Sequence, residues 1–271
     1  MGTALAGKTI VMSGGSRGIG LAILVAAARE GANAVILAKT DNPDPRLPGT
    51  IHTAVAEIEG AGGKAVGVVG DVRVEEDVQR AVDTAVSTFG GVDICVNNAS
   101  ALNLAGTEEL PLKRFDLMQQ INSRGTFLLS KTCVPHLKKS GSGQILTLSP
   151  PLNLDPKWLG PHPAYMLSKY GMTLLTLGFA AEFASDGVTA NCLWPKTTIA
   201  TAAVLNLIPD AAEASRTPEI MGDAAVAILT GARRTGQCLI DEAVLREAGV
   251  TDFSKYGTGY FALDLFVDPD D

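Results

Sequence analysis

The sequence predicts an α/β protein: a single doubly wound domain in which about seven parallel strands form one sheet with helices on both faces. Two observations lead to this prediction. Seven short apolar runs recur along the 271 residues, and helix-like segments separate them. The runs are continuously apolar rather than alternating, which is typical of strands that are buried on both faces of a parallel sheet.

The expected strands follow the apolar runs in chain order: residues 8–13, 33–38, 64–69, 92–97, 143–149, 188–194 and 236–241. Helices are expected between them, for example over residues 18–30, 74–89, 112–137 and 164–184. Two segments interrupt this alternation. One is the proline-rich stretch 41–50, and the other is residues 196–219, which we expect to form a flap over a substrate.

The composition argues against several classes of protein. Hydrophobic residues make up 46% of the chain and charged residues 19%, as in globular proteins. The net charge of −7 and the lack of a basic tract argue against a nucleic-acid partner. No run of about 18 apolar residues is present and the N-terminus has no signal-peptide pattern, so we expect no membrane span and a cytoplasmic protein. The four cysteines and three histidines lack the spacing of metal ligands, so we expect reduced thiols and no metal site.

A glycine-rich turn follows the first expected strand. The stretch SGGSRGIG, residues 13–20, places Gly14, Gly18 and Gly20 at the spacing G-x3-G-x-G, directly before an apolar helix. The first glycine permits a tight turn, the second lets the backbone approach a pyrophosphate, and the third allows close packing of helix and strand. Because the helix N-terminus then faces the anion, the turn predicts a dinucleotide site.

Tyr165 and Lys169 form a Tyr-x3-Lys pair on an expected helix, where this spacing puts both side chains on one face. A phenol with a pKa of about 10 is a poor acid or base near neutral pH, but a neighbouring ammonium favours the phenolate and lowers that pKa. The pair can then pass a proton to or from an alcohol oxygen. Ser149 ends the fifth expected strand, at the edge where sites of α/β proteins form, and can hydrogen-bond the substrate oxygen. Asn122 lies in an expected helix, where it is either an ordinary exposed residue or holds a kink and a water.

The order of these motifs resembles that of the short-chain dehydrogenase/reductase family over almost the whole chain. The matching features are the glycine turn, Asp71, the NNAS stretch at residues 97–100, Asn122, Ser149, the Tyr-x3-Lys pair and the WPK stretch at residues 194–196. The resemblance implies a Rossmann-type fold and a nicotinamide cofactor. It also implies a catalytic tetrad in which Asn122 positions a water in a proton relay and Ser149 orients the carbonyl. In that tetrad Tyr165 is the acid/base, and Lys169 lowers its pKa and binds the nicotinamide ribose.

The same resemblance implies which residues bind the cofactor. Asp71 and Val72 would contact the adenine, and Asn98 would help to fix the cofactor. The full expected set is Gly14, Ser16, Arg17, Gly18, Ile19, Gly20, Lys39, Thr40, Asp71, Val72, Asn98, Ala99, Ser100, Tyr165, Lys169, Pro195, Thr197 and Thr198.

The end of the second expected strand bears on the choice of nucleotide. A free 2′-hydroxyl suits a carboxylate, whereas a 2′-phosphate needs cationic partners. Ala38 stands where a member that prefers NAD usually has Asp, and Lys39 and Arg17 offer positive charge. Asp41 is the counterargument, because a bent loop would bring it to the ribose, although the prolines of that loop restrict the bend. We therefore expect NADP(H) to be favoured over NAD(H).

Four stretches narrow the resemblance to the hydroxysteroid dehydrogenase-like branch of the family: residues 37–59, 121–131, 148–158 and 193–203. Animal members of this branch often carry an added sterol-carrier domain. The chain ends too soon for one, so we expect residues 1–271 to form the dehydrogenase portion only. The apolar helices expected over residues 112–137 and 164–184 imply a partner surface, and we expect a homodimer or homotetramer.

These observations predict an oxidoreductase that interconverts a ketone and a secondary alcohol. A hydrophobic substrate is expected because the flap is mostly apolar and Trp158 and Trp194 lie near the expected site. An NAD-preferring enzyme of the same type is one alternative. Another is a Rossmann protein that binds nucleotide without turnover, against which the complete Asn-Ser-Tyr-Lys set argues. An enoyl reductase would space its Tyr and Lys more widely, and an extended epimerase or dehydratase usually has a longer chain.

Overall fold

A seven-stranded sheet forms the centre of the computed structural model, which describes residues 3–44, 48–207 and 212–270. The strand order is β3-β2-β1-β4-β5-β6-β7, and every neighbouring pair is parallel. The strands are β1 (Thr9–Ser13), β2 (Asn33–Ala38), β3 (Lys64–Val69), β4 (Ile94–Asn97), β5 (Gln144–Leu148), β6 (Thr189–Trp194) and β7 (Cys238–Ile240). The expected fold class is confirmed, and each strand lies close to its expected bounds.

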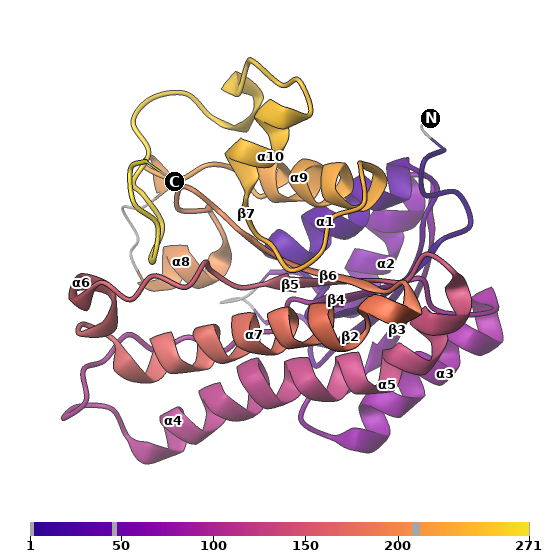
Figure 1. Ribbon diagram of the computed structural model, residues 1–271, viewed down its shortest axis with the longest axis horizontal. Helices are drawn as coiled ribbons and strands as arrows, with labels where there is room; N and C mark the ends of the chain where they lie inside the picture. The colour runs from indigo at the N-terminus through magenta and orange to yellow at the C-terminus, as the bar shows by residue number, and fades with distance from the viewer. Residues whose placement is uncertain (1–2, 45–47, 208–211, 271) are drawn as a thin grey trace.

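Helices cover both faces of the sheet (Figure 1). The helices on one face are α1 (Gly18–Arg29), α2 (Ile51–Gly60), α9 (Glu219–Thr230) and α10 (Asp241–Glu247). Those on the other are α3 (Glu75–Phe89), α5 (Gly125–Ser140) and α7 (Pro163–Glu182). Neighbouring residues of one strand enter opposite cores, as Ile10 and Met12 of β1 join the first and Val11 the second. Both faces of each central strand are therefore buried, which explains why the strands are continuously apolar.

The strand order decides where a ligand can bind. After β1 the chain moves outward through β2 and β3 and then returns to the other side of β1 as β4. At such a switch point the loops that follow neighbouring strands leave in opposite directions, and a crevice opens at the carboxyl ends. The glycine turn and the segments that follow β2, β3 and β4 all reach this crevice.

The helix expected over residues 112–137 is interrupted in the structure. It consists of α4 (Leu112–Gln119), a π-helical turn (Gln120–Arg124) and α5, which runs on to Ser140. Asn122 lies in that turn and is fully buried. Its amide donates to the Ala101 carbonyl at 3.0 Å and to Ser168 Oγ at 2.8 Å, and its Oδ1 accepts from the Ala101 N–H at 2.7 Å. Asn122 therefore marks a break in the helix rather than an exposed position.

The C-terminal strap (residues 261–268) runs beside the loop that follows β6. The Ala262 carbonyl accepts from the Thr198 N–H at 2.9 Å, and the Asp264 N–H donates to the Lys196 carbonyl at 3.0 Å. Phe266 has a φ of 70°, which is unfavourable for a bulky side chain. Its ring packs against four others, those of Trp158, Tyr165, Tyr170 and Trp194. This aromatic packing offsets the backbone strain and holds the strap in place.

The expected flap over residues 196–219 contains the helix α8 (Ala202–Leu207), while residues 208–211 lie outside the described part of the chain. A short helix, α6 (Pro156–Leu159), precedes α7. In the three described stretches, no helix has the length and apolar character that crossing a membrane requires. Nor do three His, Cys, Asp or Glu side chains of those stretches gather into a metal site.

Candidate active site

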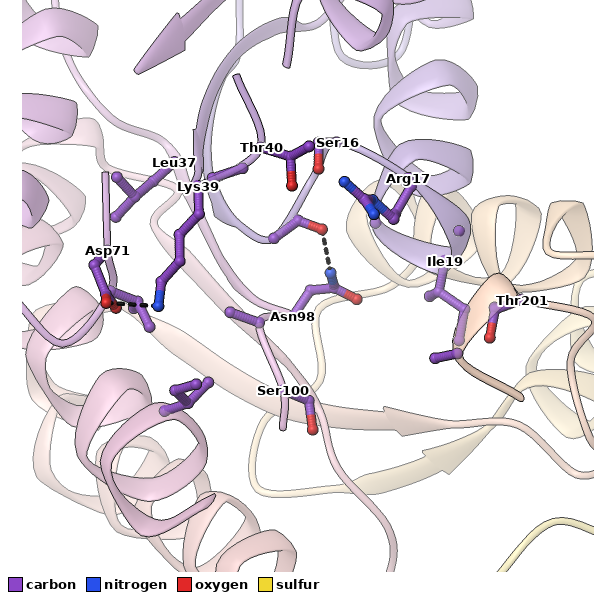
Figure 2. Close-up of a pocket in the computed structure, with 18 of the residues that line it drawn as sticks. Ser16, Arg17, Ile19, Leu37, Lys39, Thr40, Asp71, Asn98, Ser100 and Thr201 are labelled. Carbon is purple, nitrogen blue, oxygen red and sulfur yellow. Dashed lines mark hydrogen bonds and ion pairs between the residues drawn. The ribbon is translucent and has the colours of Figure 1, made fainter. Parts of the chain in front are cut away.

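The first cavity lies at the carboxyl ends of β1 to β4 and has a volume of about 430 Å³ (Figure 2). Its walls come from the glycine turn, from the end of β2, and from the segments after β3 and β4. These walls include most of the expected cofactor-binding residues: Gly14, Ser16, Arg17, Gly18, Ile19, Gly20, Lys39, Thr40, Asp71, Val72, Asn98, Ala99 and Ser100. The structure therefore brings together residues that the sequence places on four separate loops.

The glycine turn packs directly against the segment that follows β4. Gly14 has a φ of 75°, and a Cβ atom there would lie 2.9 Å from Ala99 Cα. A Cβ atom on Gly20 would lie 2.6 Å from the Gly14 carbonyl oxygen. The Asn98 side chain donates to that same carbonyl at 2.7 Å (Figure 2). With no acidic residue in the first turn of α1, this cradle suits an anion such as a pyrophosphate.

Lys39 at the end of β2 is ion-paired within the protein. Its Nζ lies 2.6 Å from Asp71 Oδ2, and Arg73 Nη2 also donates to Oδ2 at 2.6 Å. Burial raises the pKa of Asp71, but the hydrogen bonds from Arg73 and Lys39 outweigh it and hold that pKa well below the usual range. Lys39 is thus partly neutralised, and Asp71 faces two cations as well as the cavity.

Arg17 lies on the other side of the first cavity from Lys39 (Figure 2). Its Nη2 donates to the Gly49 carbonyl at 3.0 Å. Burial lowers the pKa of Arg17, and the nearby Asp44 carboxylate opposes this shift. The two cations that were expected to act together on a phosphate therefore stand apart, and Arg17 is the one that belongs to the glycine turn.

Asp41 does not reach the first cavity. Its Oδ1 lies 2.7 Å from His52 Nε2, and it is absent from the described residues that line the cavity. The first carboxylate after β2 is thus turned toward α2, away from the place where a ribose would sit.

The second cavity adjoins the first and has a volume of about 440 Å³. The two share a wall of Ile19, Asn98, Ser100, Thr201 and Ala203. The rest of the second cavity is mostly apolar, with side chains from the segment after β4, the ends of β5 and β6, the flap, α9 and the C-terminal strap. These include Leu102, Leu104, Leu148, Trp194, Ile199, Val204, Met221, Leu263 and Leu265. A ligand that spans both cavities would meet polar groups in the first and an apolar chamber in the second.

Tyr165 and Lys169 line the second cavity side by side on α7. Both side chains are buried, and Lys169 Nζ donates to the Leu148 carbonyl at 2.9 Å while lying 5.0 Å from the Trp194 ring centroid. Burial lowers the pKa of Lys169 to about 7, although Asp264 opposes this shift. Burial, and then the same carboxyl, raise the pKa of Tyr165. The pair that the sequence predicted therefore does meet at one cavity wall.

Ser149 and Asn122 are not on the walls of either cavity. Ser149 follows β5 as expected, but its hydroxyl is buried beside the Cys192 thiol and bonds no other nitrogen or oxygen of the described residues. Asn122 reaches the site through Ser168, the residue before Lys169 in the chain. Both residues therefore support the wall around Tyr165 and Lys169 rather than forming it.

Of the remaining expected residues, Pro195 and Thr198 line the second cavity, whereas Thr197 is buried outside both. Trp194 lines the second cavity, whereas Trp158 packs against Phe266 and is absent from the described lining of both cavities. Sequence reasoning missed Leu37, Gly70 and Ile121 in the first cavity and the whole strap wall in the second. The one signal for the strap was an acidic residue, Asp264, inside the apolar run FALDLF.

A family model for short chain dehydrogenases matches residues 8–210. Hydroxysteroid dehydrogenase-like protein 2 of Danio rerio is 53% identical over 269 residues, which cover 97% of this chain and 65% of that protein. The chain thus spans about 65% of the length of that relative. A putative dehydrogenase from Xanthomonas campestris has a similar structure, with a TM-score of 0.94, 52% identity, and coverage of 97% of this chain and 99% of that one. An NADH-dependent reductase responsible for alginate metabolism has a TM-score of 0.71 and 25% identity, with coverage of 88% and 96%.

Proposed function

The chain belongs to the short-chain dehydrogenase family, and we propose that it is an NADP(H)-dependent oxidoreductase that interconverts a ketone and a secondary alcohol on a hydrophobic substrate. One observation carries this proposal. Tyr165 and Lys169 lie on the wall of the mostly apolar second cavity, and that cavity shares a wall with the first cavity, which is built around the glycine turn. The arrangement offers a proton donor and acceptor beside a chamber for the substrate and a cradle for a dinucleotide.

The lining of the first cavity fits a nicotinamide dinucleotide. Gly14 and Gly20 leave no room for side chains, so backbone can approach a pyrophosphate at the start of α1. In this proposal Asp71 and Val72 face the adenine, and Lys169 holds the nicotinamide ribose. When bound, the cofactor supplies or accepts the hydride.

Tyr165 moves the proton in this proposal. In reduction its hydroxyl gives a proton to the carbonyl oxygen, and in oxidation its phenolate takes the proton back. The Lys169 ammonium favours the phenolate and so brings the pKa of Tyr165 closer to the working pH. Ser149 would donate to the substrate oxygen once its hydroxyl turns from Cys192 toward the cavity. Asn122 uses its amide on Ala101 and Ser168, so it acts by holding α7 against the wall.

The substrate is proposed to be hydrophobic because apolar side chains dominate the chamber beside Tyr165. Leu102, Leu104 and Met221 line it together with the strap residues Leu263 and Leu265. Burying the apolar part of a ketone against such a wall gains about 25 cal/mol for each Å² removed from water.

The proposed activity predicts that purified protein will oxidise NADPH in the presence of aliphatic or cyclic ketones. Loss of the absorbance of the reduced nicotinamide, measured over a series of ketones of increasing apolar size, checks this. We expect kcat/KM to rise with apolar size until the chamber is filled. Tight NADPH binding without turnover of any ketone would instead favour a nucleotide-binding protein that does not catalyse.

The same preparation tests the nucleotide preference by titration with NADPH and NADH. We expect tighter NADPH binding, with Arg17 as the main contact for the 2′-phosphate because it belongs to the glycine turn that lines the first cavity. Arg17→Ala should weaken NADPH binding by roughly tenfold, since about 1.4 kcal/mol corresponds to a factor of ten, and change NADH binding little. Lys64→Ala, at the start of β3, serves as a surface-cation control. Equal or reversed affinities in the unmodified protein would favour the NAD-preferring alternative.

We also propose that the protein assembles as a homodimer or homotetramer through α4, α5 and α7. Four large apolar side chains on these helices remain exposed: Leu112, Phe127, Leu167 and Leu174. A face of this kind is typical of a subunit interface. Sedimentation velocity should therefore give a mass above that of one chain, and replacing Leu174 by Glu should lower it. A single-chain mass at all concentrations would contradict the proposal.

A further inference from the structure

Asp264 is the one acidic side chain among the described residues that line the second cavity. Lys169 is the one basic side chain of that lining, and the other residues are apolar or neutral. An acid is expensive to keep on such a wall unless a charge partner or hydrogen bonds stabilise it. Its presence beside Tyr165 and Lys169 therefore calls for a chemical reason.

The C-terminal strap holds Asp264 firmly on this wall. The Asp264 N–H donates to the Lys196 carbonyl at 3.0 Å, and Asp264 Oδ1 accepts from the Leu265 N–H at 2.8 Å. On the far side, Trp194 Nε1 donates to the Leu265 carbonyl at 2.9 Å. These bonds hold Asp264 in the lining of the second cavity, which also includes Tyr165 and Lys169 of α7.

The Asp264 carboxylate interacts electrostatically with two side chains of α7. Its negative charge raises the pKa of both Lys169 and Tyr165, while burial lowers the first and raises the second. Lys169 is almost fully removed from water, so without a counter-charge its ammonium would be easily lost. One anion thus increases the proton affinity of both members of the pair.

We propose that Asp264 is the counter-charge of the Tyr165–Lys169 pair and that it holds Lys169 in its charged form beside the proton donor Tyr165. The inference rests on the proposed function, since it assigns Tyr165 the role of proton donor. Asp264 touches neither cofactor nor reacting atoms in this scheme, and it acts through the two residues of α7 as a positioning residue.

The other charged groups around Asp264 determine when it acts. Asp241, at the start of α10, is a like-charged neighbour; it is fully buried and bonds the N–H groups of Lys196 and Glu242. Arg216 in turn offsets the charge of Asp241. Burial, and secondarily Asp241, raise the pKa of Asp264 to about 7, while Lys169 opposes this. The carboxyl therefore becomes an anion mainly above neutral pH, where burial would otherwise make Lys169 lose its proton.

Asp264→Asn tests the proposal in the full-length chain. Reduction needs the charged Lys169, because its ammonium stabilises the phenolate that remains after proton transfer. The rate therefore falls as pH rises through the pKa of Lys169, and a nearby anion moves that fall to higher pH. In the Asn variant the alkaline limb of kcat/KM for ketone reduction should move to lower pH by roughly one unit, because a nearby charge shifts a pKa by that amount or more. Asp264→Glu should restore much of the kcat/KM that the Asn variant loses at alkaline pH.

A second readout does not depend on turnover. Carbon NMR of the lysine ε-carbons gives the titration midpoint of Lys169, identified by the signal missing from Lys169→Met. The midpoint should also fall by roughly one unit in Asp264→Asn. If no ketone is reduced by the unmodified protein, the proposed function fails, and the NMR midpoint still decides the role of Asp264.

Asp268→Asn is the matched control, because Asp268 lies on the same strap and accepts from Asn153 and Trp158 outside the cavity. This variant removes the same charge and loosens the strap without changing the cavity wall. The alkaline limb of kcat/KM and the titration midpoint of Lys169 should therefore not move. If neither the alkaline limb of kcat/KM nor the Lys169 midpoint moves in Asp264→Asn, the proposal is overturned. An equal shift in Asp268→Asn would also overturn it, because that result would assign the effect to strap docking rather than to charge.

Discussion

Replacing Tyr165 by Phe should lower kcat for ketone reduction by roughly a hundred- to ten-thousand-fold and leave the Kd for NADPH nearly unchanged. The loss is large because the phenol is the proposed proton donor at the substrate oxygen. Binding should survive because the Tyr165 hydroxyl makes no hydrogen bond to the described residues around the cavity, and the ring keeps its contact with Phe266, at 6.1 Å between centroids. Stopped-flow or steady-state kinetics measure kcat, and a fluorescence titration measures the Kd for NADPH.

Tyr170→Phe provides a control on the same helix. The Tyr170 hydroxyl donates to the Asn153 carbonyl at 2.6 Å and accepts from the Asn153 N–H at 3.2 Å, so its loss should lower stability rather than chemistry. We expect Tyr170→Phe to retain most of the turnover at temperatures where it stays folded. Undiminished turnover in Tyr165→Phe would remove the proposed acid/base.

Replacing Gly14 by Ala should weaken nucleotide binding by roughly a hundredfold, which is about 2.8 kcal/mol. A residue with a side chain pays about 1–2 kcal/mol in the left-handed region that Gly14 occupies, with φ at 75°. The new Cβ would also lie 2.9 Å from Ala99 Cα and 3.0 Å from Ala99 N. That backbone cannot easily withdraw, because Ser13 Oγ accepts from the Ala99 N–H at 3.2 Å. The glycine turn must move instead, and part of the binding free energy of the nucleotide would be used to return the turn to its original conformation.

Gly60→Ala is the matched control for this substitution. Gly60 ends α2, and a Cβ atom there would meet nothing within 4 Å. Alanine is favoured over glycine in a helix by roughly 0.5–1 kcal/mol, so this variant should be slightly more stable and bind NADPH normally. Calorimetric titration of both variants compares them directly. Normal affinity in Gly14→Ala would show that the turn does not form the pyrophosphate cradle.

The features that sequence reasoning placed correctly depend on local pattern. Strands buried on both faces must be continuously apolar, and the Tyr165–Lys169 spacing is one helical turn, so both could be predicted without knowing the fold. The glycine turn is equally local, because Gly14 and Gly20 are needed wherever the backbone approaches so closely.

The features that sequence reasoning missed depend on contacts between distant segments. Lys39 and Asp71 were each expected at the nucleotide site, but their ion pair forms only because β2 and β3 are neighbours in the sheet. Asn122 breaks a helix because Ala101 and Ser168 offer it hydrogen bonds from two other segments. Asp264 lines the cavity because the strap packs there, and no sequence pattern predicts that packing.

The residues that line the two cavities extend to different points along the chain. Every described residue that lines the first cavity lies between Gly14 and Ala203, whereas the second also needs Ala262 to Leu265. A chain clipped before the strap would keep the walls of the first cavity and lose one side of the second. It would also lose Asp264. During synthesis on the ribosome, the residues that line the first cavity therefore emerge before the strap residues that complete the second.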